Sequence, residues 1–351
     1  MCREETGWSR VPSDGVRYFD LLSLLSVLYG SIMQERSSME NYIDMLSSAE
    51  SYTASYVACR LCARGCGANR LTGERGFCGQ TAELFAARAA LHHWEEPILS
   101  GSRGSGTIFF SGCSLGCIYC QNQAISAGGA GKPVSTGHLA EICLELEEKG
   151  AHNINLVTPG HFVPHIKKAL ELARLQGLSI PIVYNTGSYE TVSTLRSLEG
   201  LIDIYLPDLK YFSPVLSREY SHAEDYFAVA TQAIAEMVRQ TGSPILTPDG
   251  KLLQKGVIVR HLLLPGETAD SKKILRYLKE NYDDRIYISI MNQYTPLPHV
   301  AEHPKLQRRV TTEEYARVLR FAEQIGITRG FVQEGDTAKE SFIPAFDGEG
   351  L

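Results

Sequence analysis

From Thr107 onward the sequence alternates between short apolar runs rich in β-branched residues and longer segments with helical spacing. This alternation predicts a mostly parallel sheet with crossover helices. We expect strands at residues 107–111, 153–158, 180–186, 202–207, 257–264, 286–290 and 327–333. We expect helices near residues 136–149, 162–176, 189–198, 222–240, 267–281 and 311–325. Six or seven such units are too few for an eight-stranded barrel, so the predicted fold is an α/β partial barrel of the (βα)6 type.

Two local patterns refine this prediction. Leu139, Ile142, Cys143 and Leu146 recur with helical spacing, which makes Cys143 a buried core residue. The segment 244–256 interrupts the alternation, and its Pro-Asp-Gly core predicts a β-hairpin inserted before the fifth strand.

Composition divides the chain into four regions. They are an N-terminal extension (1–50), a cysteine-rich segment with a connector (51–105), the barrel core (106–335) and a C-terminal tail (336–351). The end of the connector is too rich in Gly and Ser for a helix.

The N-terminal extension contains an apolar run at residues 21–29 that has the outline of a weak signal peptide. Asp20 directly precedes this run, and the run is too short to span a membrane as a helix. Two interpretations are favoured over a signal peptide: a surface or flexible segment, and an over-extended gene model with translation starting at Met33 or Met39. Both predict a cytoplasmic protein with no membrane partner.

The charge and the cysteines exclude other classes of protein. The net charge is −6 and no long basic run exists, which argues against nucleic acid as a partner. Of nine cysteines, seven fall in two tight groups, at residues 59–78 and 113–120. Two such groups within a long α/β pattern indicate metal ligands in a reducing compartment rather than a disulfide scaffold.

The second group, Cys113, Cys117 and Cys120, forms a C-x3-C-x2-C loop directly after the first predicted strand of the barrel. Three thiolates in one loop can bind three irons of a 4Fe-4S cluster, which leaves the fourth iron open for a substrate. Gly112 and Gly116 would let the loop wrap closely around such a cluster. The alternative, a closed zinc site, lacks a fourth ligand nearby.

The first group, Cys59, Cys62, Cys66 and Cys78, has the spacing C-x2-C-x3-C-x11-C. Four thiolates can close a tetrahedral zinc site or hold an auxiliary iron-sulfur cluster, and the spacing fits either. The group therefore predicts a second metal site, with four free thiols as the alternative. The nearby stretch 92–96, His-His-Trp-Glu-Glu, is interpreted as a polar loop with one anchoring Trp, with a second source of metal ligands as the alternative.

Polar residues follow or end most of the predicted strands. In parallel βα folds the chemistry lies in the loops at the carboxyl ends of the strands, so these residues should converge on one face. They are Thr158 to His161, Asn185 to Gly187, Asp208 and Lys210, Arg260 and His261, and Asn292 to Tyr294.

The loop with Cys113, Cys117 and Cys120, directly after the predicted strand 107–111, resembles the signature of the radical S-adenosylmethionine (SAM) superfamily. The resemblance implies that the amino and carboxylate groups of SAM chelate the open iron. It also implies that one electron from the cluster cleaves SAM to methionine and a 5′-deoxyadenosyl radical, which abstracts a hydrogen atom from the substrate.

A wider part of the chain, from about Tyr56 to Asn292, resembles the PflX-like group, homologous to pyruvate formate-lyase activating enzyme. The resemblance implies that the partner substrate is a glycyl radical enzyme, activated at a backbone glycine, and that the reductant is a flavodoxin or a ferredoxin. A radical SAM enzyme acting on a small molecule or peptide, with an auxiliary metal site, is the alternative, followed by a non-enzymatic iron-sulfur or zinc protein. The matching segments are 59–67, 104–113, 155–159, 182–186, 205–211 and 259–266.

The resemblance also implies roles in SAM binding. Thr158 begins a Thr-Pro-Gly segment where activating enzymes carry Gly-Gly-Glu, which meets the SAM amino group. Asn185 stands in the position of an Asp that shapes the site. Asp208 and Lys210 match an Asp-x-Lys motif, and Arg260 matches an arginine near the SAM carboxylate, a natural bidentate pair.

Two further residues have open roles. Tyr119, within the cysteine loop, is expected to shield the cluster or to stack on a ligand. His261 is either a site residue or a core histidine with satisfied nitrogens.

Overall fold

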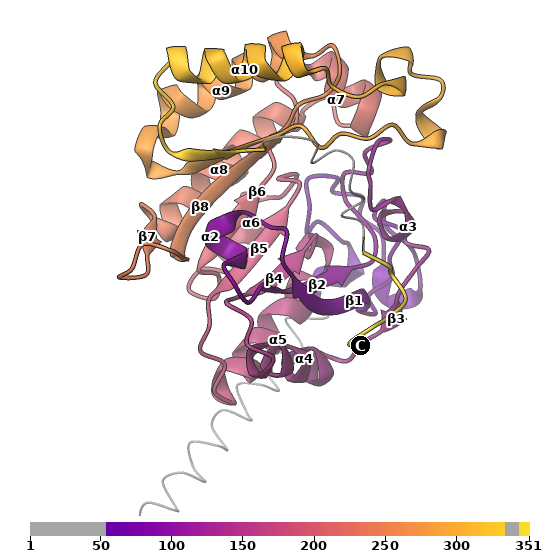
Figure 1. Cartoon of the computed structure of the whole chain (residues 1–351). Helices are drawn as coiled ribbons and strands as arrows, with labels where there is room; N and C mark the ends of the chain where they lie inside the picture. The colour runs from indigo at the N-terminus through magenta and orange to yellow at the C-terminus, as the bar shows by residue number, and fades with distance from the viewer. Residues whose placement is uncertain (1–53, 334–343) are drawn as a thin grey trace, which may run out of the picture. The chain divides into compact units, whose positions relative to one another are not determined.

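The computed structural model describes residues 54–333 and 344–351, which fold around one open sheet (Figure 1). Its strands are β1 (Phe85–His92), β2 (Ser105–Phe110), β3 (Lys132–Pro133), β4 (Ile154–Val157), β5 (Ile182–Thr186), β6 (Ile204–Pro207), β7 (Ile245–Leu246), β8 (Leu253–Leu262), β9 (Tyr287–Met291) and β10 (Gly330–Val332). Among the described residues the strand order is β10-β9-β8-β6-β5-β4-β2-β1-β3, and β7 pairs with β8.

The strands from β2 to β10 that form the barrel wall run parallel, in the order β2, β4, β5, β6, β8, β9 and β10. In the resulting register Leu156 lies opposite Ile108 on one side and Tyr184 on the other. Every strand that the sequence predicted is present, and the open parallel sheet confirms the predicted α/β partial barrel. The carboxyl ends of these strands therefore meet at one edge of the sheet.

Helices connect the parallel strands, and short sequence signals set where several of them begin. Ser135 accepts a hydrogen bond from the N–H of His138 at the start of α4, and Thr311 and Glu314 form a capping box at α10. In Figure 1, α4 lies beside α5 and α9 lies beside α10. The helices are α2 (Pro97–Ser100), α3 (Gln123–Ser126), α4 (Thr136–Glu148), α5 (Val163–Leu175), α6 (Val192–Arg196), α7 (Pro214–Ser221), α8 (Tyr226–Thr241), α9 (Thr268–Tyr282) and α10 (Thr312–Gln324).

The two sides of the sheet are covered differently. On the helix-covered side Leu156 and Tyr184 join the main core, which also contains Cys143, as predicted. On the other, concave side Leu99 of α2 packs with Val183 in a separate apolar cluster. Side chains alternate between the two sides along each strand, so consecutive residues at a strand end lie in different environments.

The connector expected up to residue 105 contains a strand that the sequence pattern did not indicate. Residues 85–92 form β1, which is antiparallel to β2. Their alanine-rich composition has low β propensity, so the strand forms because the free edge of β2 supplies hydrogen-bond partners. The Gly- and Ser-rich stretch also ends sooner than expected, because Ser105 and Gly106 already belong to β2.

Two helix predictions need adjustment, whereas the hairpin prediction is confirmed. Helix α6 is shorter than the expected span 189–198, and the span 222–240 corresponds to α8. Helix α7 precedes α8 and was not indicated by the sequence, although Pro214 at its first turn is a common helix start. The predicted hairpin in 244–256 is the antiparallel pair of β7 and β8.

The last described segment, 344–351, returns to β1. The N–H of Ala89 donates to the carbonyl of Glu349 at 2.9 Å. Phe346 packs edge-to-face on Phe109 of β2, with ring centroids 5.4 Å apart. Part of the predicted C-terminal tail is thus packed against the barrel wall.

None of the helices in the described ranges is long and apolar enough to cross a membrane. The predictions for residues 1–50, including a start at Met33 or Met39, lie outside the described residues.

Candidate functional site

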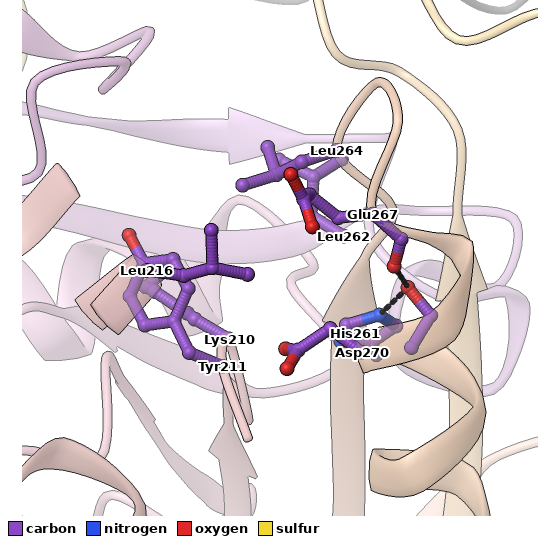
Figure 2. Close-up of a pocket in the computed structure, with 9 residues that line it drawn as sticks. Lys210, Tyr211, Leu216, His261, Leu262, Leu264, Glu267 and Asp270 are labelled. Atoms are coloured by element: carbon purple, nitrogen blue, oxygen red, sulfur yellow. Dashed lines mark hydrogen bonds between the residues drawn. The ribbon is translucent and has the colours of Figure 1, made fainter. Parts of the chain in front are cut away.

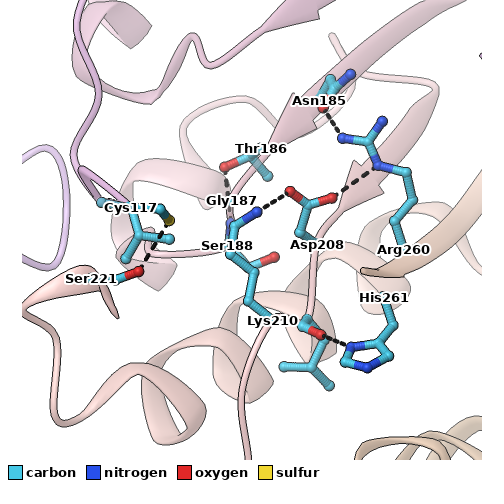
Figure 3. Close-up of polar contacts among 12 residues, drawn as sticks. Cys117, Asn185, Thr186, Gly187, Ser188, Asp208, Lys210, Ser221, Arg260 and His261 are labelled. Atoms are coloured by element: carbon cyan, nitrogen blue, oxygen red, sulfur yellow. Dashed lines mark hydrogen bonds and ion pairs between the residues drawn. The ribbon is translucent and has the colours of Figure 1, made fainter. Parts of the chain in front are cut away.

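The three cysteines Cys113, Cys117 and Cys120 lie in the loop that follows β2, at the carboxyl edge of the sheet, and all are partly exposed. The N–H of Leu115 lies 3.4 Å from the sulfur of Cys113. The hydroxyl of Ser221, at the end of α7, donates to the sulfur of Cys117 at 3.0 Å (Figure 3). Hydrogen bonds to sulfur ligands tune iron-sulfur clusters, so both contacts suit a cluster loop.

The donor set of this loop fits a 4Fe-4S cluster. Burial, together with the neighbouring Cys117 and Cys120, raises the pKa of the Cys113 thiol to about 12. A bound metal reverses such a shift, because a coordinating thiol loses its proton. In the described part of the chain, no three His, Cys, Asp or Glu side chains converge as the ligands of a single metal ion do. A 4Fe-4S cluster does not require this convergence, because each thiolate binds a different iron.

The two glycines of the loop have left-handed backbones, with φ of 86° at Gly112 and 63° at Gly116. A Cβ at Gly112 would lie 2.5 Å from the carbonyl oxygen of Cys78, and one at Gly116 would lie 3.5 Å from the ring of Phe77. That these glycines let the loop wrap around a cluster stays a prediction. The structure adds a second reason for them: the four-cysteine segment packs directly against the loop.

A charged network lies beside the cysteine loop, at the ends of β6 and β8 (Figure 3). One carboxylate oxygen of Asp208 accepts from Nζ of Lys210 at 2.7 Å, and the other accepts from Nε of Arg260 at 2.9 Å. Nη2 of Arg260 donates to the side-chain oxygen of Asn185 at 2.6 Å. The structure therefore brings four of the predicted SAM-site residues into direct contact.

Mutual charge stabilises the ionised forms in this network. Burial alone would raise the pKa of Asp208, but Arg260 and then Lys210 hold it below its ordinary value. Burial alone would lower the pKa of Lys210, but Asp208 and then Cys117 hold it well above its ordinary value. Lys210 is therefore a charged link between the network and the cysteine loop.

Two glutamates that the sequence did not single out belong to the same region. One oxygen of Glu95 lies 3.3 Å from Nη1 of Arg260, and the other accepts from Asn155 at 3.1 Å. Burial raises the pKa of Glu95 and of the adjacent Glu96, although Arg260 opposes the shift. The stretch 92–96 was expected to be a polar loop with one anchoring Trp. In the structure His92 ends β1, Glu96 is buried, and Trp94 is 65% exposed. The only hint in the sequence that these glutamates are covered was the apolar segment Pro97–Ser100, which directly follows them and forms α2.

The role implied for Arg260, pairing with the SAM carboxylate, stays a prediction. In this structure its guanidinium is bonded by Asp208, Asn185 and Glu95. Lys210 has one carboxylate contact and three ammonium protons, so it retains donor capacity toward a ligand.

Backbone strain is concentrated at the same edge of the sheet. Thr158, after β4, has a φ of 58°, and Ser188, after β5, has a φ of 65°. A non-glycine residue in this region costs about 1–3 kcal/mol, and a β-branched residue is unusual there. The N–H of Thr158 donates to the carbonyl of Asn185 at 2.8 Å, which places Thr158 beside the network.

Tyr119 is packed within the protein. The rings of Tyr211, Tyr220 and Tyr294 lie edge-to-face around it, with centroids 6.1 to 6.3 Å away. Of the two predicted roles, this packing favours shielding of the cysteine loop over stacking on a ligand.

His261 has the environment of a core histidine. Its Nδ1 lies 2.8 Å from the carbonyl oxygen of Leu209, and its Nε2 lies 2.9 Å from the hydroxyl of Ser271. Burial lowers the pKa of His261 to about 4. A small pocket beside His261 also includes Lys210 of the network (Figure 2). It is lined by Lys210, Tyr211, Leu216, His261, Leu262, Leu264, Glu267, Asp270 and Ser271.

The four cysteines of the N-terminal segment, Cys59, Cys62, Cys66 and Cys78, are gathered next to the cysteine loop. Three of them are buried, and Cys66 is exposed. Burial raises the pKa of Cys62 to about 12 and also raises that of Cys78. The four side chains lie in one segment, but no three of them converge as the ligands of a single metal ion do, and the metal itself stays a prediction.

Two contacts with the cysteine loop come from residues that the sequence did not indicate. Ser221 lies 104 positions from Cys117, so no local pattern could connect them. Arg64 lies between two cysteines of the N-terminal group and donates to carbonyls of the loop, including that of Leu115 at 3.0 Å. Its position within the cysteine motif was the only available signal.

Comparison with known proteins agrees with this arrangement. Residues 107–278 match the sequence profile of the radical SAM superfamily. The chain is 30% identical over 277 residues to an uncharacterized protein of Methanocaldococcus jannaschii, an alignment that covers 77% of this chain and 75% of that protein.

Two solved structures are similar at low identity. One is a domain of a pyruvate-formate lyase-activating enzyme from Bacteroides vulgatus ATCC 8482, with a TM-score of 0.34 and 13% identity over 49% of this chain and 93% of that chain. The other is HydG, a maturase of the FeFe-hydrogenase, with a TM-score of 0.44 and 17% identity over 66% of this chain and 52% of that chain.

A partial α/β barrel with three cysteines in the loop after its first parallel strand is the arrangement of a radical SAM protein. The chain belongs to the radical SAM superfamily. Membership implies an enzyme with a 4Fe-4S cluster and SAM, which Cys113, Cys117 and Cys120 are suited to hold.

Proposed function

We propose that this chain is a glycyl-radical activase of the PflX-like type, which uses SAM to abstract a hydrogen atom from a backbone glycine of a partner enzyme. The observation that carries the proposal is the joint position of the cysteine loop and the network of Asp208, Lys210 and Arg260 at one strand edge. The protein substrate rests on the six segments that resemble the PflX-like group.

The balance of the reaction requires one electron per SAM. The electron cleaves the bond from the sulfonium sulfur to the 5′ carbon, methionine leaves, and the 5′-deoxyadenosyl radical takes the glycine hydrogen to become 5′-deoxyadenosine. We propose a flavodoxin or ferredoxin as the electron donor and the cytoplasm as the reducing compartment that keeps the cysteines free.

We assign different roles to the charged and the uncharged residues of the site. Lys210, held charged by Asp208, faces the cysteine loop and offers its remaining ammonium protons to an anionic group of SAM. Asn185 and Thr158 fix the adjoining strand ends through one backbone hydrogen bond. Arg260 holds the carboxylate of Asp208 in place.

The proposal is tested by anaerobic reconstitution with iron and sulfide, followed by an assay of 5′-deoxyadenosine release with SAM and either dithionite or a reduced flavodoxin. A glycyl radical enzyme labelled with Cα-deuterated glycine is then added as the substrate. An activase transfers one deuterium into 5′-deoxyadenosine and leaves an organic radical on the partner, visible by electron paramagnetic resonance. Release of 5′-deoxyadenosine without deuterium would contradict the glycine as hydrogen donor.

A second candidate is an enzyme that acts on a small molecule or a peptide with an auxiliary metal site. The four-cysteine segment favours it, because activating enzymes do not all carry such a segment. In that case small-molecule or peptide extracts, and not the labelled protein, should stimulate 5′-deoxyadenosine release.

A further inference from the structure

The four-cysteine segment surrounds a buried cation, Arg70, whose side chain is 1% exposed. The guanidinium donates to the carbonyls of Thr81 at 2.7 Å and His161 at 2.6 Å, and it lies 3.6 Å from the sulfur of Cys59. It also lies over the ring of Tyr56, 4.6 Å from the centroid. Within the described residues, no carboxylate forms an ion pair with it.

A buried guanidinium without an anion is costly, so its environment should supply negative charge. Carbonyl groups and an aromatic ring offer only partial charges. Neutral thiols offer little more, whereas thiolates bound to a cluster carry the missing charge, because the negative charge of four thiolates exceeds the positive charge of an oxidised 4Fe-4S core.

Gly76 marks the space between the cysteines. A Cβ at Gly76 would lie 3.2 Å from the sulfur of Cys66, 3.5 Å from the sulfur of Cys78 and 4.0 Å from Cδ of Arg70. Gly76 does not have the left-handed backbone that would by itself require glycine, so the need for a small residue comes from the space near the two sulfurs.

The same segment also holds the loop of the family's cluster in place. Arg64 donates to the carbonyls of Ser114 at 2.8 Å and Leu115 at 3.0 Å, both within the cysteine loop. It also donates to the carbonyls of Ser221 at 2.7 Å and His222, at the end of α7. The hydroxyl of Ser221 donates to the sulfur of Cys117. The guanidinium of Arg64 therefore connects the cysteine loop with the residue that donates to this sulfur.

Packing reinforces the connection. The guanidinium of Arg64 lies 3.8 Å from the ring centroid of Phe77, and that ring faces Gly116 of the loop. The carbonyl oxygen of Cys78 likewise lies against Gly112 of the loop. Residues on both sides of the family's cluster loop are therefore in contact with the four-cysteine segment.

We propose that Cys59, Cys62, Cys66 and Cys78 hold a second iron-sulfur cluster, whose thiolates balance the charge of Arg70, and that this centre positions the cysteine loop of the barrel through Arg64. A cluster fits these residues better than a single zinc ion, because each thiolate of a cluster binds a different iron, whereas no three such side chains of the described residues converge as the ligands of one ion do. The inference concerns a site outside the proposed reaction, so it does not depend on the glycine substrate.

The metal is tested in a variant with Cys113, Cys117 and Cys120 all changed to Ala, purified without oxygen. Zinc, iron and acid-labile sulfide per chain are then measured by plasma mass spectrometry and colorimetry. We expect about four iron with acid-labile sulfide at the remaining site, whereas about one zinc without iron would show that the site does not hold a cluster. Less than about a tenth of an equivalent of either metal would overturn the proposal.

The wild-type chain gives the same answer if the triple variant does not fold. After reconstitution we expect about eight iron per chain. A total of about four iron, with or without zinc, would overturn the proposal. This outcome is distinct from failure of the proposed function, which is read from 5′-deoxyadenosine and the labelled partner.

Gly76→Ala probes the site in the triple variant without removing a ligand. The added methyl group lies against two sulfurs, so we expect at least about a threefold loss of bound metal. Gly137→Ala, in α4, is the matched control, because its Cβ meets no atom closer than 4.0 Å. Equal metal in the two variants would contradict a centre between these cysteines.

Arg64→Ala, in the otherwise wild-type chain, tests the positioning role. We expect the second metal to stay and the visible absorbance and electron paramagnetic resonance signal of the barrel cluster to fall about threefold, because four carbonyl contacts are lost. Arg60→Ala is the control, since Arg60 is exposed in the same segment. An unchanged cluster signal in Arg64→Ala would show that the segment does not position the loop.

Discussion

Arg260 and His261 are neighbours in β8, yet they lie in different environments. Arg260 faces the concave side and shares Asp208, Asn185 and Glu95 in a charged network. His261 faces the helix-covered side, where each ring nitrogen has one hydrogen-bond partner. A polar residue at a strand end is thus not by itself a site residue, because the side of the sheet on which it lies decides its role.

The cysteines show the same division. Cys117 lies in the loop at the strand edge, beside Lys210 and Ser221. Cys143 lies in the helix-covered core and is fully buried. Variants on the concave side and its edge should therefore change the chemistry, whereas variants on the helix-covered side should change stability alone.

The largest expected effect follows removal of a cluster ligand. Cys117→Ala should lower 5′-deoxyadenosine release by at least about a thousandfold, because the cluster loses one of its three thiolates. Cys143→Ala is the matched control and should keep the cluster and at least about half of the activity, at a modest cost in stability. Comparable activity in the two variants would remove the distinction between the two environments.

The next effect concerns the charged network. Arg260→Met should lower the free energy of unfolding by about 3–5 kcal/mol, because it leaves the carboxylates of Asp208 and Glu95 without their shared cation. Adding Asp208→Asn and Glu95→Gln should restore part of this loss. The measurement is urea unfolding of the reduced protein.

An exposed ion pair provides the control for this network. Lys149→Met breaks the pair with Glu145 on the surface of α4 and should cost less than about 1 kcal/mol. If Arg260→Met lowered the free energy of unfolding no more than Lys149→Met does, the network on the concave side would not stabilise the fold.

The fold could be predicted from the sequence because each barrel strand is a short apolar run and most helices show helical spacing of their apolar residues. The sequence also predicted four residues of the network, since each lies near or just after the end of a strand: Asn185, Asp208, Lys210 and Arg260. It could not predict that Glu95 joins them or that Ser221 bonds to Cys117, because both contacts join segments far apart in the chain. Nor could it predict β1, whose alanines form a strand only because β2 offers an edge.

His261 gives the helix-covered side a dependence on pH. Its pKa is about 4 in the folded protein, against about 6.5 in an unfolded chain. Between these values the unfolded chain binds more protons, so stability is full above about pH 6.5 and falls as the pH falls toward 4. From pH 7 to 4.5 this residue should account for about 2–3 kcal/mol, which His261→Gln should remove from the urea unfolding curves. Equal losses in the variant and the wild type would mean that His261 is not held neutral by its core.

The smallest expected effect concerns the hydrogen bond from Ser221, at the end of α7, to Cys117 in the cysteine loop. Ser221→Ala removes the hydroxyl that donates to the sulfur of Cys117 but leaves the backbone carbonyl that binds Arg64. A hydrogen bond to a ligand sulfur stabilises the reduced cluster, so its loss should lower the reduction potential by some tens of millivolts. Ser217→Ala, one turn earlier in α7, removes a hydroxyl that bonds only within its helix and is the matched control. A redox titration followed by electron paramagnetic resonance separates the two variants, and equal potentials would show that Ser221 supports the loop without tuning the cluster.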